Sequence, residues 1–156
     1  MEKYNEKSLV RGAITTGIIN AVINGGIQYF LLKDRSSILV SVDSITNNEE
    51  TVLGLAVTLA ITLSMILTIV AYFGIKGKKV PFFPTTLLRT IKHGFFTFGV
   101  LTSLAVLWQK YMGTVEVSLI VALITIGVIS GIVSAVINYL TLKESIVFTA
   151  ETKQNV

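Results

Sequence analysis

Three side-chain amides recur at four-residue intervals in the first apolar segment of the chain: Asn20, Asn24 and Gln28. On a helix this spacing places them on one face. Amides donate and accept hydrogen bonds without carrying charge, so the row could bind a neutral polar solute or replace part of a cation's hydration shell. An amide without a partner is costly in hydrocarbon, so the row needs another helix, another subunit, water or a ligand.

A matching series lies in the last apolar segment, where the polar residues are Ser130, Ser134 and Asn138. Each polar series runs beside small residues at the same spacing, which let helix backbones approach closely. We expect these small residues to form packing surfaces, and antiparallel packing would bring Asn20 and Asn24 level with Ser130–Ser134, and Asn138 near Thr16. The polar series then has two interpretations, hydrogen bonds between helices or a water-lined pathway. The small residues are Gly17, Ala21, Gly25, Gly127, Gly131 and Ala135.

A basic cluster begins the third apolar segment, with Arg89, Lys92 and His93, and Thr97 follows one turn later. Three basic groups oppose the helix dipole at a helix N-terminus, so they need another explanation. One explanation is topology together with anionic lipid headgroups. The alternatives are an anion site at the mouth of a pathway, or a proton relay through His93.

Composition narrows the chemistry. Of 156 residues, 52% are hydrophobic and 14% charged, against about 25% charged in soluble domains. The net charge is +4, but the basic residues lie between apolar runs, so we expect no nucleic-acid partner. The absence of cysteine and the single histidine exclude Cys-based chemistry and a conventional metal site, and no cofactor is expected. No catalytic constellation is present, so we do not expect an enzyme.

The apolar segments predict four membrane spans at approximately 10–32, 51–75, 87–109 and 117–142, because about 20 residues cross the hydrocarbon. An outer loop, 33–50, contains a partly alternating stretch, Ser37–Val42, typical of a short strand or an interfacial segment. A basic inner loop, 76–86, and a short polar tail, 143–156, complete a single membrane domain, 1–156. The second span carries hydroxyls that can bond their own helix: Thr58, Thr62, Ser64 and Thr68.

The positive-inside rule orients the chain. With four spans, one side carries most of the basic residues, which predicts that both termini are cytoplasmic and that the protein lies in a bacterial inner membrane. That side holds Lys3, Lys7, Arg11, Lys76, Lys78, Lys79, Arg89, Lys92, Lys143 and Lys153.

These features predict an all-α polytopic membrane protein, a four-transmembrane-helix bundle. Because four short spans rarely enclose a wide pathway, we expect a homo-oligomer, a dimer first. No carboxylate falls within the predicted spans, which favours passive permeation over active pumping. The leading function is a small permease or channel-like protein passing a polar solute or ion between the first and fourth spans. The alternatives are a scaffold or accessory subunit that binds a partner membrane protein, and a membrane stress effector.

Overall fold

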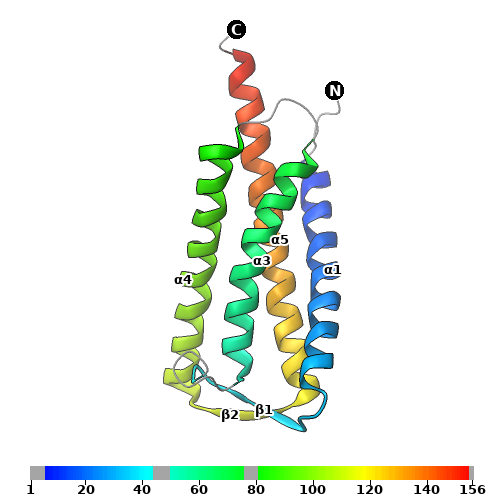
Figure 1. Ribbon diagram of the computed structural model, residues 1–156, viewed down its shortest axis with the longest axis vertical. Coiled ribbons are helices and arrows are strands. Elements are labelled where there is room, and N and C mark those ends of the chain that lie inside the picture. The colour runs from blue at the N-terminus through cyan, green and yellow to red at the C-terminus, as the bar shows by residue number, and fades with distance from the viewer. Residues whose placement is uncertain (1–5, 44–49, 76–80, 155–156) are drawn as a thin grey trace.

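The computed structural model describes residues 6–43, 50–75 and 81–154, and it confirms the all-helical prediction. Figure 1 shows helices running side by side, with the start of α1 and the end of α5 at one end, the termini end. Both strands lie at the opposite end, the ribbon end. The elements are α1 (Glu6–Leu32), β1 (Ser37–Val40), α3 (Val52–Gly74), the short turn η1 (Phe82–Thr86), α4 (Leu87–Met112), β2 (Val115–Ser118) and α5 (Leu119–Gln154).

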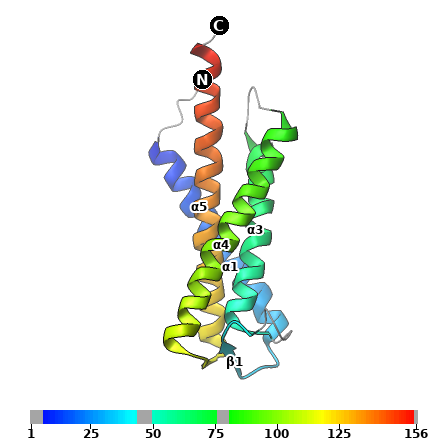
Figure 2. The ribbon, with the colours of Figure 1, turned by 90° about the vertical axis from the view of Figure 1, so that its left-hand side faces the viewer.

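The helices pack in the order α1, α5, α3, α4: α5 contacts α1 and α3, and α3 also contacts α4. The first and last helices are therefore direct neighbours. Figure 2 shows that α5 and the α3–α4 pair diverge toward the termini end. As a result α4 is held mainly by α3.

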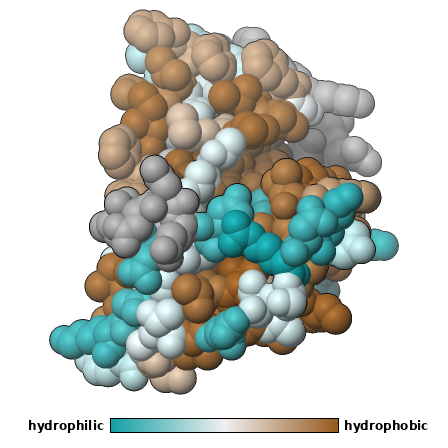
Figure 3. Space-filling view, turned by 60° about the horizontal axis from the view of Figure 1, so that its bottom comes forward, coloured by the Kyte–Doolittle hydropathy of each residue, from teal (hydrophilic) through white to brown (hydrophobic). Residues whose placement is uncertain are grey.

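The ribbon end is closed by a two-stranded antiparallel sheet in which Ser37 pairs with Ser118 and Val40 with Val115. Of the two alternatives for Ser37–Val42, a short strand or an interfacial segment, the structure has the strand β1, whereas β2 was not expected. Gly113 makes the turn before β2 with a φ of 70°, a conformation that favours glycine. Side chains from β1 and three helices form the apolar cluster beneath, and Val117 of β2 packs against it: Leu32, Ile38, Val40, Val52, Ala56, Ala122 and Ile126 are buried there. Figure 3 shows hydrophilic side chains gathering at this end while the helix flanks are hydrophobic.

Three helical segments are long and apolar enough to cross a membrane: Val52–Gly74, Phe82–Met112 and Leu119–Glu144. The segments at 51–75, 87–109 and 117–142 match them to within a few residues. Among the described residues, α1 does not reach the same apolarity. The three amides of α1, which suggested a functional role from the sequence, also lower its mean hydropathy.

In the predicted short polar tail, 143–156, α5 continues as one helix to Gln154. Residues 44–49 of the predicted outer loop and 76–80 of the basic inner loop lie outside the described residues.

Candidate functional site

The α1–α5 contact is a close approach of two backbones. A Cβ placed on Gly17 would lie 2.7 Å from the Gly131 carbonyl oxygen and 3.0 Å from the Ala135 Cβ. A Cβ placed on Gly127 would lie 3.1 Å from the Ala21 carbonyl oxygen. The structure therefore brings the two small-residue stripes together, and Gly25 continues the contact less tightly, toward Leu123. We call this contact the α1–α5 seam.

The register of the seam differs from the predicted one by about one helical turn. Gly17 lies against Gly131 and Ala135, and Gly25 lies nearest Leu123. Asn24 is therefore level with residues near Ile126, rather than with Ser130. The glycines set this register, because only where they oppose each other can the backbones come so close.

The polar side chains of the seam bond their own helices. The Asn20 Nδ2 donates to the Thr16 carbonyl oxygen at 2.9 Å, and the Asn24 Nδ2 to the Asn20 carbonyl oxygen at 2.8 Å. On α5 the Ser134 hydroxyl donates to the Ser130 carbonyl oxygen at 2.7 Å. Ser130 likewise donates to the Gly127 carbonyl oxygen, at 2.9 Å, and Asn138 is half-buried.

Gln28 differs from the other amides, because its Oε1 is buried without a hydrogen-bond partner. It lies near the ribbon end of α1, one turn before the buried Leu32. Sequence spacing grouped Gln28 with Asn20 and Asn24, but the local bonding separates it from them.

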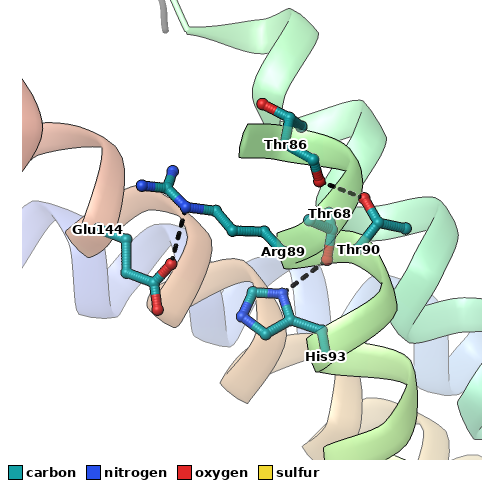
Figure 4. Close-up of polar contacts among 6 residues, drawn as sticks. All are labelled: Thr68, Thr86, Arg89, Thr90, His93 and Glu144. Carbon is teal, nitrogen blue, oxygen red and sulfur yellow. Dashed lines mark hydrogen bonds and ion pairs between the residues drawn. The ribbon is translucent and has the colours of Figure 1, made fainter. Parts of the chain in front are cut away.

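A second polar group lies between α3 and α4, toward the termini end. The His93 side chain is 3% exposed, and its Nδ1 lies 2.8 Å from the Thr68 Oγ1. Thr68 in turn donates to the Ser64 carbonyl oxygen at 2.8 Å. Figure 4 shows the imidazole directed from α4 toward the Thr68 hydroxyl.

An ion pair links this group to α5. The Arg89 Nε lies 3.1 Å from the Glu144 Oε2, and their side chains are 16% and 34% exposed. Figure 4 places the pair on the side of the imidazole away from Thr68. We call Ser64, Thr68, Arg89, His93 and Glu144 the His93 cluster.

Sequence reasoning missed three members of this cluster, Ser64, Thr68 and Glu144. Glu144 was assigned to the polar tail, but α5 continues and brings it to Arg89. Its spacing from Thr141 and Ser134 already matched a helical face, and this signal was available in the sequence. Thr68 was expected only to bond its own helix; it does so, and it also contacts His93.

The structure places the residues of the predicted basic cluster in different environments. Arg89, His93 and Thr97 turn inward to different depths, with Thr97 5% exposed, whereas Lys92 is exposed. Thr90, which lies between Arg89 and His93 in the sequence, is also buried. Its hydroxyl donates to the Thr86 carbonyl oxygen at 2.9 Å. Lys92 therefore faces the surroundings of the bundle, and the other three line the α4 side of its interior.

The cluster combines an imidazole, a hydroxyl and a carboxylate–guanidinium pair within a few turns of three helices. Such a set can bind hydrogen-bonding groups and can hold or pass a proton. Among residues 6–43, 50–75 and 81–144, no group of three or more His, Asp or Glu residues is placed to hold a metal ion.

No protein-family model matches the chain, and the searches of curated proteins and of solved structures gave no match either.

Proposed function

We propose that this chain is a small membrane permease in which the His93 cluster, rather than the α1–α5 seam, handles a polar solute or ion. The observation that carries the proposal is the buried imidazole of His93, bonded to Thr68 between two helices apolar enough to span a membrane. Ionisable groups inside membrane segments are costly and are commonly retained for substrate or proton pathways.

The distribution of side chains on α1 supports the proposal that this first helix is a membrane span as well. Val22 is 71% exposed, whereas Asn24 and Gln28 are each 7% exposed. A helix facing water would present its amides outward and bury its valines and isoleucines. The reverse arrangement suits a helix whose outer face contacts lipid. The mean hydropathy of α1 includes these inward-facing amides, so it understates how apolar the outer face of the helix is.

The charge distribution supports an orientation with the termini end in the cytoplasm. Lys7, Arg11, Arg89, Lys92 and Lys143 all belong to the parts of α1, α4 and α5 nearest that end. By the positive-inside rule this end faces the cytoplasm. His93 lies six residues into α4, a rise of about 9 Å, so the cluster would lie near the cytoplasmic side of the membrane.

The close contact of the seam argues against a pathway there. Where Gly17 meets Gly131, even a methyl group would contact the opposite backbone. The amides and hydroxyls beside that contact bond carbonyls of their own helices. The seam therefore serves best as the joint between α1 and α5.

The ribbon end favours a carrier over a permanently open channel. The apolar cluster under β1 and β2 closes that end, while α5 diverges from α3 and α4 at the termini end (Figure 2). Passage of a solute would require the ribbon end to open. We expect slow, saturable transport from this arrangement.

The scaffold alternative has its own supporting observations, the closely packed seam and the broad apolar flanks of α1 and α4. On that account the flanks bind partner helices and the His93 cluster only stabilises the fold. We rank it second because it gives no reason for burying a histidine beside an ion pair.

Solute flux into liposomes containing the purified protein tests the proposal. A panel of protons, small cations, small anions and neutral polar solutes would be followed with a pH-sensitive dye and by light scattering. We expect flux of at least one of them, and a loss of about tenfold or more in His93→Ala, since tenfold corresponds to about 1.4 kcal/mol.

Asn24→Leu is the matched variant at the seam, and we expect it to keep flux within about twofold, or about 0.4 kcal/mol. If Asn24→Leu abolishes flux while His93→Ala retains it, the pathway lies at the seam. If no solute passes and a membrane protein co-purifies in stoichiometric amount, the scaffold alternative is correct.

A further inference from the structure

The hydrogen bonds around Thr68 determine which nitrogen of His93 carries a proton. A threonine hydroxyl has one hydrogen to donate and lone pairs to accept. The Thr68 Oγ1 lies 2.8 Å from the Ser64 carbonyl oxygen and 2.8 Å from the His93 Nδ1. A carbonyl can only accept, so the hydroxyl hydrogen is directed to Ser64.

The contact with His93 must then be supplied by the imidazole. If Nδ1 carried no hydrogen, it would meet the Thr68 oxygen as two acceptors at 2.8 Å without a proton between them, which is repulsive. With a hydrogen on Nδ1, both contacts become hydrogen bonds. The neutral ring therefore has the Nδ1–H tautomer, and its lone pair is on Nε2.

We infer that Nε2 of His93 is the atom at which this site binds and releases a proton, and that Thr68 is the positioning residue that leaves Nε2 available. The inference rests on the proposed function, because it names the ion that the site handles. In Figure 4, Nε2 lies on the edge of the ring that faces α5 and Glu144.

The charged groups around the imidazole come from two elements. Arg89 and Lys92 belong to α4, and Glu144 belongs to α5, where it is paired with Arg89. Helix α3, which supplies Thr68, has no Asp, Glu, Lys or Arg between Val52 and Gly74. Glu144 is therefore the one acidic side chain among these groups, and it lies at the termini end of the cluster.

The proton step is simple. A proton carried by hydronium, or donated by a protonated solute, forms an N–H bond at Nε2, leaving water or the conjugate base of the solute, and the ring becomes an imidazolium held by Thr68 at Nδ1. On return, the Nε2–H bond breaks and the proton leaves to water or to that base. Nδ1 keeps its hydrogen throughout, so the ring does not need to rotate. This arrangement favours a proton, or a donor of one, over an anion as the species that Nε2 receives.

The tautomer can be read directly, because His93 is the single histidine of the chain. The full-length protein would be labelled with ¹⁵N-histidine, placed in lipid bilayers, and studied by nitrogen NMR across a pH titration. We expect the hydrogen-bearing nitrogen at alkaline pH to be Nδ1, with Nε2 showing the shift of an unprotonated ring nitrogen. On acidification the Nε2 signal should move to that of a protonated nitrogen, while Nδ1 changes little.

Thr68→Val removes the hydroxyl while keeping the side-chain shape. We expect the variant to lose the Nδ1–H preference and to shift both ring signals toward the Nε2–H tautomer. Thr62→Val is the control on α3, because Thr62 makes the same kind of bond, to the Thr58 carbonyl oxygen at 3.0 Å, and is exposed. Thr90→Val is a buried control on α4. Both controls should leave the ring signals unchanged.

The inference is overturned if wild-type His93 is the Nε2–H tautomer at alkaline pH, or if Nδ1 is the nitrogen whose protonation changes on acidification. An unchanged spectrum in Thr68→Val overturns the role of Thr68. If Thr68→Val does not fold, the wild-type titration still decides the tautomer. The nitrogen signals do not depend on transport, so an expected spectrum without solute flux would remove the proposed function and leave the protonation site standing.

Discussion

The α1–α5 seam and the His93 cluster are both rows of polar residues in apolar helices, yet they have different partners. At the seam, Asn20, Asn24 and Ser134 donate to carbonyls one turn earlier in their own helices. In the cluster, His93 bonds a different helix and Arg89 pairs with a third. Polar spacing alone does not distinguish these cases. What distinguishes them is whether a side chain can satisfy its polar atoms locally.

The size of the side chain explains the difference. Hydroxyls and short amides reach the preceding turn of their own helix, so they can be buried without a ligand. An imidazole or a guanidinium does not reach back in this way, and its nitrogens need partners on other elements. A buried histidine is therefore a stronger indication of function in a membrane segment than a row of asparagines.

The largest expected effect is loss of stability at the seam. In Gly17→Leu the new side chain would enter the space of Gly131, and we expect overpacking to destabilise the protein by about 3 kcal/mol. The measurement is the free energy of unfolding of the purified protein in detergent. Gly26→Ala is the control, because a Cβ there meets nothing within 4 Å. Equal stability of the two variants would mean that the seam is not closely packed.

A smaller effect is expected from the ion pair of the cluster. Arg89→Ala leaves a half-buried Glu144 without its partner, and we expect a loss of about 1–2 kcal/mol in unfolding free energy. The matched control is Arg35→Ala at the ribbon end, whose pair with Glu50 is 50% and 49% exposed. That substitution should cost less than about 0.5 kcal/mol. If the two variants lose the same amount, the Arg89–Glu144 pair is an ordinary surface contact.

Much of the fold follows from the sequence, because apolar length, small-residue spacing and turn residues are local signals. Three helices long and apolar enough to span a membrane, and the small-residue stripes that meet in the seam, could be read from it, and a strand at Ser37 was one of two alternatives. The register could not, since it depends on which glycine opposes which. The His93–Thr68 contact also could not be read, because it depends on how α3 and α4 rotate against each other.

The proposed contrast between a closely packed seam and a pathway at the His93 cluster can be measured by chemical accessibility, since the chain has no cysteine of its own. Single variants Thr97→Cys, one turn beyond His93, and Asn24→Cys, at the seam, would be exposed in liposomes to a membrane-impermeant, cationic methanethiosulfonate. We predict that Thr97→Cys reacts at least about tenfold faster, a difference of about 1.4 kcal/mol in the free energy of access. If Asn24→Cys reacts as fast as Thr97→Cys or faster, water and solute enter along the seam and the assignment of the pathway to the His93 cluster is wrong.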